Sequence, residues 1–411
     1  MGIRPVSNTL RSALVNDSWV LVASDLHLAA NTTSASLAVE RELSRAISEG
    51  SKHQHGIIVL NGDIIEMWAG ERPSVVKALK AHPKLTRAIA DFAKLPDHKV
   101  FYVIGNHDGK LGWDKKSQKD VASYLSAKLC FTLELISPQG SIRFEHGHRF
   151  DPDNSFEDPR DPYDKPFGQY LVQQALPLVK ESQGKLLAGI DHLAEPHQFP
   201  KFVASRVMYR EIVNRSWWLL IPIIITLIGR IVVGLGIYQV SGIDSKHILE
   251  IIILTELAVF INVALIVLVL VLILQNILKR AKGIPGQGAG IHHNDPPRDE
   301  AKLQIHKGNL GVITGHTHRP ELTKIEHGFY ANSGCGTKMI MASKAKFGLP
   351  KTYIAKNQLS WLELTFADNL DINLYSGSTV VGEQTRLERA LTKKRHSEQP
   401  IGLQKHLRIE L

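Results

Sequence analysis

The stretch Val100-Phe101-Tyr102-Val103-Ile104-Gly105-Asn106-His107-Asp108 decides the fold, because an apolar run ends in a glycine that three polar residues follow. A run of apolar, β-branched and aromatic residues of this length predicts a strand buried on both faces. The glycine permits a tight turn directly after the strand. The stretch therefore predicts polar side chains on a loop at the edge of a buried sheet, where a rigid scaffold can hold them.

The same pattern recurs along the chain. Residues 19–27 read WVLVASDLH, residues 57–66 read IIVLNGDIIE, residues 142–148 read IRFEHGH and residues 310–318 read LGVITGHTH. Amphipathic patterns between these runs predict helices at residues 34–49, 74–94 and 117–129, the second of them broken by Pro83. Strands that alternate with helices predict an α/β domain.

The polar residues after these runs are of the types that bind divalent metals. Two ions roughly 3.5–4 Å apart need a shared carboxylate, several imidazoles and neutral oxygen ligands, with positions left open for water and a phosphoryl oxygen. The chain supplies such a set in one order, and these are the candidate metal ligands: Asp25, His27, Asp63, Asn106, His146, His316 and His318.

The five segments resemble the calcineurin-like metallophosphoesterase superfamily, whose pattern is D-x-H, G-D, G-N-H-D/E, H and G-H-x-H. The resemblance covers residues 19–149 and 310–337 and implies a four-layer α/β/β/α sandwich with two divalent ions. We expect Mn, with Fe, Zn and Mg as alternatives. It implies one ion on Asp25, His27, Asp63 and His318. It implies the other on Asp63, Asn106, His146 and His316, with Asp63 as the bridging carboxylate.

The resemblance also implies a catalytic role for His107, which would face the phosphate and donate a proton to the leaving group. Glu66 stands at the offset of the carboxylate that orients this histidine, and a hydroxide bridging the ions would attack phosphorus. Asp108 either supports this site or caps the turn after Asn106.

Three further residues stand beside the candidate ligands. His148 is the alternative to His146 as the ligand in its segment. Arg149 and Arg319 either hold substrate phosphate bidentately or are solvated structural arginines.

Two apolar segments interrupt the domain and predict a transmembrane hairpin. Residues 217–238 are apolar apart from Thr226 and Arg230, and residues 248–278 form a longer apolar stretch. A spanning helix needs about 20 mostly apolar residues. Because motifs on both sides of these segments must meet at one site, the chain must return to the side that it left, as two spans do. Arg230 could then pair with Glu250 or Glu256, or extend to the interface.

Flanking charge sets the expected orientation. Arg206, Arg210 and Arg215 precede the first span, and Lys279, Arg280 and Lys282 follow the second. By the positive-inside rule the catalytic domain and both termini are cytoplasmic. Residues 1–19 contain no apolar h-region of a signal peptide, and the 2 cysteines, Cys130 and Cys335, suit a reducing compartment.

The charge balance predicts attraction to an anionic membrane. The formal net charge is +9, and basic residues lie beside the spans and near the C-terminus, at Arg386, Arg389, Lys393, Lys394 and Arg395. No aromatic and basic interleaving typical of RNA binding occurs, so a nucleic-acid partner is not expected.

The expected organisation is a phosphoesterase domain in two parts, residues 1–150 and 310–380. Between them come a helical lid-like insertion (151–216), the hairpin (217–278) and a linker with a helix (279–309), and a basic tail follows at 381–411. The insertion is similar to the lid of UDP-diacylglucosamine pyrophosphohydrolases, which often have Arg where His107 stands. We expect hydrolysis of a phosphoester or pyrophosphate of a lipid-linked substrate. The alternatives are a tethered phosphodiesterase or phosphatase for soluble nucleotides, and a non-catalytic membrane scaffold.

Overall fold

The computed structural model describes residues 6–69, 73–175, 199–212, 220–241, 244–280, 293–382, 384–393 and 397–411. Their strands are β1 Ser7–Ala13, β2 Ser18–Ala23, β3 His55–Asn61, β4 His98–Val103, β5 Lys128–Ser137, β6 Gly140–Glu145, β7 Asn309–Thr314, β8 Glu321–Ile325, β9 Gly328–Asn332, β10 Gly336–Ser343, β11 Thr352–Phe366, β12 Asn369–Val380 and β13 Gln399–Glu410. The helices are α1 Ser34–Gly50, α2 Val75–Ala81, α3 Pro83–Phe92, α4 Lys115–Leu125, α5 Phe167–Tyr170, α7 Phe199–Arg206, α9 Leu220–Ser241, α10 Ser245–Arg280, α11 Asp295–His306 and α12 Arg386–Leu391.

The strands form a continuous path in the order β13-β12-β11-β2-β3-β4-β5-β6-β7-β9-β8, with β1 added to β5 and β10 to β11. Strands β2, β3, β4 and the start of β5 run parallel. Strands β2, β3 and most of β4 are buried on both faces, as the apolar runs predict. In β2, Trp19 and Leu21 pack into the core beneath the helices, whereas Val20 and Val22 pack into a second core on the other face.

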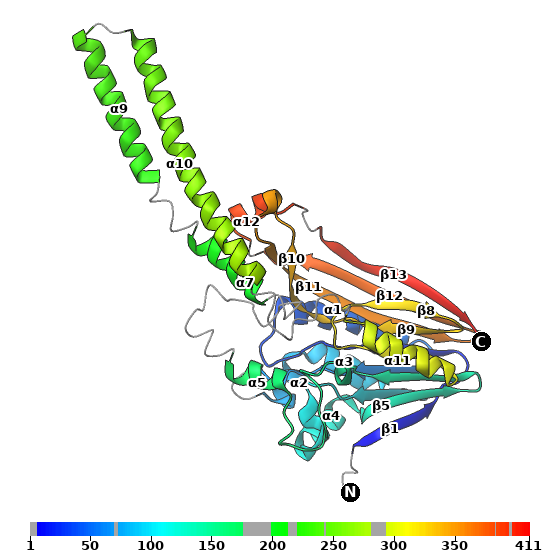
Figure 1. Cartoon of the computed structure of the whole chain (residues 1–411). Helices are drawn as coiled ribbons and strands as arrows, with labels where there is room; N and C mark the ends of the chain where they lie inside the picture. Colours follow the sequence, from blue (N-terminus) through cyan, green and yellow to red (C-terminus); the bar gives the residue numbers. More distant parts are fainter. Residues whose placement is uncertain are drawn as a thin grey trace.

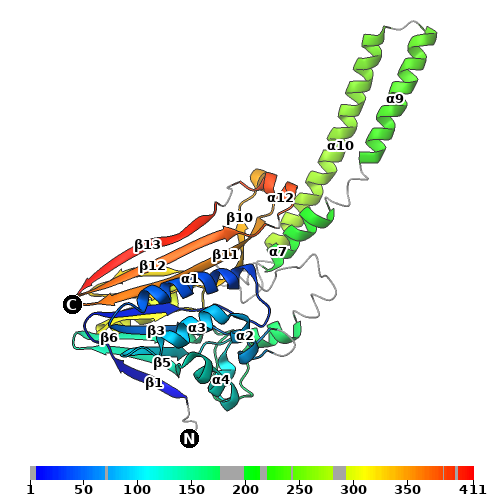
Figure 2. The same ribbon diagram turned by 180° about the vertical axis from the view of Figure 1, so that it is seen from behind.

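The helices lie where the amphipathic patterns predict them. Thr33 caps α1 through a capping box with Ser36, and Pro83 stands at the first turn of α3, which separates α3 from α2. Helices α1 to α4 contribute to the core on one face of β2 to β4, and α11 packs on β7 and β9. Both views show these layers (Figures 1 and 2). The fold is mixed α/β.

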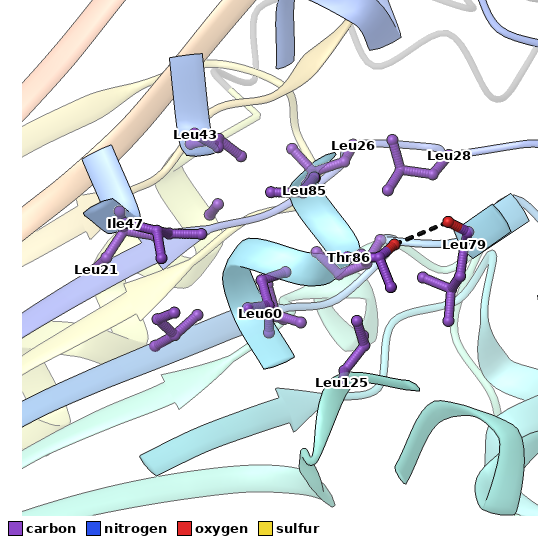
Figure 3. A pocket seen from close by; sticks show the side chains of 14 residues that line it. Leu21, Leu26, Leu28, Leu43, Ile47, Leu60, Leu79, Leu85, Thr86 and Leu125 are labelled. Carbon is purple, nitrogen blue, oxygen red and sulfur yellow. Dashed lines mark hydrogen bonds between the residues drawn. The ribbon is translucent and has the colours of Figure 1, made fainter. Parts of the chain in front are cut away.

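The core beneath α1 and α3 contains a small apolar cavity. Figure 3 shows Leu43, Leu85 and Leu60 pointing into it from α1, α3 and β3. Thr86 supplies a hydroxyl, which donates a hydrogen bond of 2.8 Å to the backbone oxygen of Leu79. A cavity with this lining belongs to the packing of helices on the sheet and offers no polar groups for catalysis.

Helices α9 and α10 pack against each other as an antiparallel hairpin that projects from the domain (Figures 1 and 2). Arg230 of α9 lies 2.8 Å from Glu256 of α10, one of the two partners expected from the sequence. Among the described residues, one helix is long and apolar enough to cross a membrane, at Lys246–Ile266, and its apolar window is not buried. The apolar stretch of α9 is shorter, at Ile224–Gly236. The expectation of two spans is therefore met by length and composition for one helix only.

The base of the hairpin lies at the end of the sheet that carries the motif loops. Strand β11 runs antiparallel to β2, and because Leu362 pairs with Val22, residues 352–360 extend beyond the C-terminal end of β2. Helix α7 packs on this extension, where Phe202 contacts Tyr353 at a ring distance of 5.0 Å. The C-terminus lies at the opposite end of the domain (Figure 1).

Two sequence expectations differ from the structure. The sequence pattern predicts a helical or disordered tail at residues 384–411; α12 is a helix within this range, but β13 pairs with β12 along most of its length. The sequence pattern of residues 353–375 predicts strands at a sheet edge, but β11 lies between β12 and β2, inside the sheet.

Several other expectations fall partly outside the described residues. They concern the lid-like insertion at 176–198 and 213–219, the linker at 281–292, and the basic pair Lys394 and Arg395.

Candidate metal centre

The loops after β2, β3, β4, β6 and β7 bring all seven candidate ligands to one end of the sheet. Five of them have a positive φ, a conformation that is uncommon for residues other than glycine: Asp25 (53°), His27 (46°), Asp63 (54°), His316 (66°) and His318 (56°). Backbone strain of this kind costs about 1–3 kcal/mol per residue and clusters at functional sites. The loops are therefore shaped to aim these side chains at a common centre.

Glycines in the same loops make room for the ligands. A Cβ atom on Gly105 would lie 2.2 Å from Asp63 Oδ1, and one on Gly315 would lie 2.6 Å from Asp25 Oδ2. A Cβ atom on Gly62 would lie 2.3 Å from His146 Nδ1. These glycines are required because each lets backbone approach a ligand side chain more closely than any other residue could.

The candidate ligands form two adjoining groups. Asp25, His27 and His318 make the first, and Asp63, His146 and His316 make the second, with the ligand atoms of each within 4.8 Å of one another. In the first group, His318 Nε2 lies 3.2 Å from both Asp25 Oδ1 and His27 Nε2. In the second, His146 Nε2 lies 3.1 Å from Asp63 Oδ2. Asn106 joins this group through its Oδ1, 3.1 Å from His316 Nδ1.

The charges at this centre hold each other in the ionised form. Burial alone would raise the pKa of Asp63, but His146 and His107 hold it well below its usual value. Burial would likewise lower the pKa of His146, yet Asp63 and Asp25 raise it to about 10. His146 Nδ1 lies 2.9 Å from the backbone oxygen of Asn61, so it donates there and leaves Nε2 facing the carboxylates.

The donor set fits divalent cations. Asp25 Oδ1 and His146 Nε2 are buried 3.8 Å apart, and neither makes a well-aligned hydrogen bond to a described residue. Buried polar atoms normally have partners. Carboxylate, imidazole and amide ligands suit first-row divalent ions. The residues present therefore fit divalent ions in two groups, which the contact between Asp25 Oδ1 and His146 Nε2 joins.

His107 lies beside the first group and is held on two sides. Its Nδ1 lies 2.8 Å from Glu66 Oε2, and Trp68 stacks on its ring at 4.0 Å. Burial would lower the pKa of His107, but Glu66 and Asp63 raise it to about 9. The same Glu66 oxygen lies 3.0 Å from His27 Nδ1. Glu66 therefore orients a candidate ligand as well as the candidate proton donor.

Asp108 lies beneath the loop as a positioning residue. Its carboxylate accepts hydrogen bonds from the backbone N–H groups of Gly105 and Ile64 and from the hydroxyl of Tyr102. Burial raises the pKa of Asp108 to about 7, and the charge of Asp63 adds to the effect. This is the turn-capping role, and it also joins the loops after β3 and β4.

His148 is buried beside the second group. Its ring lies 5.6 Å from that of His146 and 6.5 Å from that of His316. Burial and these two histidines lower its pKa to about 3, so the ring is neutral. The structure brings His146 rather than His148 into the ligand groups.

The two candidate substrate arginines differ. Arg149 makes a bidentate pair with Glu145, at 2.6 and 3.1 Å, and also lies 3.6 Å from Glu300. The structure therefore directs this guanidinium to carboxylates of the domain. Arg319 is half-buried directly after His318, and its backbone oxygen accepts a hydrogen bond from Asn294.

Two residues at the centre, Asp151 and Trp68, were missed by the sequence reasoning, and Asn332 was part of the resemblance but was given no role. Asp151 Oδ2 lies 3.1 Å from His316 Nε2, Trp68 stacks on His107, and Asn332 donates to the backbone oxygen of Gly315 at 2.7 Å. Asn332 carried a signal, since it follows an apolar run as the other loop residues do. Asp151 and Trp68 carried none, because their places depend on how separate loops meet.

Comparison with known proteins finds one family model that matches part of the chain. Residues 18–211 match the model described as calcineurin-like phosphoesterase, a range that ends before His316 and His318. No curated protein matches the chain.

Three solved structures are similar at low scores, which carry no argument about fold or function. Vps29 from Chaetomium thermophilum is 8% identical, with 95% of this chain and 96% of that chain covered, at a TM-score of 0.34. Vps29 from Entamoeba histolytica, as a single mutant, is 10% identical (89% and 99% covered, TM-score 0.29). A predicted phosphoesterase from Streptococcus pneumoniae is 9% identical (90% and 100% covered, TM-score 0.26). Residues 18–211 are therefore similar to the calcineurin-like phosphoesterases over a little less than half of the chain, and the two ligand groups also include His316 and His318 from beyond that range.

Proposed function

We propose that this chain is a membrane-integrated phosphoesterase that holds two divalent metal ions and hydrolyses a phosphoester or pyrophosphate bond of a lipid-linked substrate. The observation that carries the hydrolytic part is the meeting of two ligand groups from five distant segments around the buried atoms Asp25 Oδ1 and His146 Nε2, which make no well-aligned hydrogen bond to a described residue. The proposal also assumes that the sheet and its helices form a four-layer α/β/β/α sandwich.

The expected metal is Mn, with Fe, Zn and Mg as alternatives that the metal content of the purified protein distinguishes.

Each side chain of the centre then has one task. Asp25, His27 and His318 would hold one ion, Asp63, Asn106, His146 and His316 the other, and Asp63 would be shared between them. Bound ions of this kind supply Lewis acidity and lower the pKa of water. His107, kept charged by Glu66, donates a proton to the leaving oxygen, and Trp68 limits the motion of its ring.

The exposed apolar surface of the hairpin supports insertion into a bilayer. Leu254, Phe260 and Ile266 of α10 are 65%, 61% and 61% exposed, and Val232 of α9 is 62% exposed. Soluble monomers rarely expose continuous apolar surface on this scale. The 36 residues of α10 would extend about 54 Å, against roughly 30 Å of bilayer hydrocarbon, so the last turns of α10 remain outside as a stalk.

Two contacts inside the hairpin suit a lipid environment. Arg230 and Glu256 pair at 2.8 Å, which neutralises two charges that would otherwise face hydrocarbon. A Cβ atom on Gly234 would lie 2.6 Å from Ile248 Cγ2, so a small residue permits close approach of the helices. With Arg206 and Arg210 before α9 and Lys279 and Arg280 at the end of α10, the proposed orientation places the catalytic domain in the cytoplasm.

The shared location of the hairpin base and the motif loops supports a lipid substrate. Both lie beyond the C-terminal end of β2, which would place the metal centre at the end of the domain nearest to the bilayer. Acyl chains held in lipid could then orient a phosphoryl group at the ions.

The experiment compares a small chromogenic phosphodiester with a long-chain lipid phosphoester, both with Mn added. A matched variant keeps both helices and the contacts of Arg230 and Gly234 but replaces outward apolar residues by Gln, Glu and Lys; these are Ile225, Ile228, Val232, Leu254, Leu257, Phe260, Ile261 and Leu265. We expect the variant to keep the small-substrate activity and to lose at least about 10-fold in lipid turnover. Equal retention of both activities would favour the reading with soluble nucleotides as substrates. Absence of both activities from the unaltered, metal-loaded chain would favour the scaffold.

A further inference from the structure

A basic surface with one exposed aromatic side chain lies at the base of the hairpin. We define the basal surface as residues 343–352, between β10 and β11, and residues 384–393, which contain α12. Its exposed cations are Lys344, Lys346, Lys351, Arg386, Arg389 and Lys393. Within these two described stretches the one carboxylate is Glu388, which is buried.

Phe347 projects from the middle of this surface. Its side chain is 87% exposed, between Lys346 and Gly348, and its φ is 57°. A bulky residue rarely adopts this backbone conformation. An aromatic ring that is strained into solvent and flanked by lysines has the chemistry of an interfacial anchor, in which the ring enters the headgroup layer while the cations meet lipid phosphates.

Hydrogen bonds join the two stretches of the basal surface into one unit. Lys346 Nζ donates to the backbone oxygen of Ala390 at 2.9 Å, and the N–H of Lys393 donates to the oxygen of Lys344 at 2.9 Å. The hydroxyls of Thr352 and Thr392 lie 2.8 Å apart. The loop that carries Phe347 is therefore fixed to α12.

The basal surface is also fixed to the segment that leads into the hairpin. Arg210 binds Glu388 through two hydrogen bonds of 3.2 Å, and Arg206 lies 3.6 Å from the same carboxylate. The hydroxyl of Tyr209 donates to the backbone oxygen of Pro350 at 2.7 Å. Both views place α12 beside the base of the hairpin (Figures 1 and 2).

We infer that the basal surface docks on an anionic phospholipid leaflet, with Phe347 inserted at the headgroup level. The inference rests on the proposed membrane insertion and deepens it, because a second contact beside the hairpin fixes the tilt of the catalytic domain. It commits to one partner, an anionic bilayer, on the complementarity of six exposed cations and on the continuity of the surface with the hairpin.

The test places an environment-sensitive fluorophore on Phe347→Cys in the full chain. The native cysteines, Cys130 and Cys335, are buried. The labelled chain is reconstituted in nanodiscs of phosphatidylcholine with or without phosphatidylglycerol, and quenching by lipids spin-labelled near the headgroup is measured. The matched control carries the label on Val15→Cys, which is 45% exposed in the turn before β2, at the opposite end of the parallel strands.

We expect quenching and a blue shift at position 347 in anionic discs, and neither at position 15. Reversing Lys344, Lys346 and Lys351 to Glu should weaken insertion of the loop by about fivefold per lysine. A label at position 347 that behaves as the control does in anionic discs would overturn the inference. A blue shift of the label at position 347 with duplex DNA but not with anionic lipid would also overturn it. Alkaline extraction of the same samples reports hairpin insertion separately, so failure of the basal surface and failure of the proposed anchor are distinguishable.

Discussion

The candidate metal centre buries charged side chains, whereas the hairpin exposes apolar ones, and both depart from the usual distribution of side chains in a folded protein. At the centre, Asp25 and Asp63 are 0% and 1% exposed, whereas Leu254 and Phe260 of the hairpin are 65% and 61% exposed. Charged groups are seldom fully buried, and contiguous apolar surface is seldom exposed. Our proposal gives each region a partner from outside the chain: divalent cations for the carboxylates and lipid for the apolar helices.

The two regions also differ in how the chain builds them. The centre depends on strained loops, since five candidate ligands have positive φ, and on glycines that admit close contacts. The hairpin depends on regular helices joined by one ion pair and a close glycine contact. Substitutions at the centre should therefore change chemistry without changing membrane insertion, and substitutions in the hairpin should do the reverse.

The largest expected effect is at the shared carboxylate. Asp63→Ala should reduce hydrolysis by about 1,000-fold or more, because it removes the group between the two ion sites and the partner of His146. Metal content should fall, and alkaline extraction should show unchanged membrane insertion. Asp91→Ala, at an exposed carboxylate of α3, is the control. Near-normal activity of Asp63→Ala would refute the two-metal assignment.

The next effect separates proton donation from metal binding. His107→Ala should lose roughly 100-fold in rate while it keeps most of its metal, as expected for a positioned acid. Glu66→Ala should lose both rate and metal, because Glu66 also orients His27. Metal analysis and steady-state rates of the two variants check this, with exposed His306→Ala as the control. A loss of metal from His107→Ala would make His107 a ligand instead.

A smaller effect is expected at Asp151, which holds the ring of His316 from outside the ligand groups. Asp151→Ala should weaken metal affinity or activity by about 10- to 100-fold, the usual range for residues that orient a ligand. Metal titration of the variant measures it, and Asp153→Ala, an exposed neighbour, serves as the control. If both variants bind metal as tightly as the unaltered chain, Asp151 does not position His316.

The smallest effect is expected within the hairpin. Arg230→Leu should lower stability in detergent by about 2 kcal/mol, because Glu256 is left without its partner in an apolar setting. The double variant Arg230→Leu with Glu256→Leu should recover to within about 1 kcal/mol of the unaltered chain. Thermal unfolding in detergent measures both, while metal content should stay constant. A double variant that is less stable than the single one would show that the pair is needed for more than neutralisation.

The sequence predicted the parts of the molecule that depend on local pattern. Apolar runs placed β2, β3, β4 and β7, and the polar residues after them proved to lie together at one end of the sheets. Pro83 separated α2 from α3 because it fits the first turn of a helix and not its interior. The offset of three residues between Asp63 and Glu66 placed Glu66 against His107.

The remainder depended on contacts between distant segments. Strand β13 carries exposed cations on a sheet edge, and the alternation of Leu407, Ile409 and Leu411 was the weak signal of its pairing. Asp151 reaches His316 only because β6 and β7 pair side by side. Arg149 pairs with Glu145 of β6 and with Glu300 of α11, and no local pattern in the sequence reveals these pairs.

The most direct test of the account is a metal titration of the full chain in lipid nanodiscs after removal of bound ions by a chelator. Metal content per chain and hydrolysis of a phosphodiester are measured together as Mn is added. The account predicts that hydrolysis is absent without metal and appears as the second ion binds, with two ions per chain at saturation. Full activity of the metal-free chain, or saturation with two ions without hydrolysis of any phosphoester tested, would contradict it.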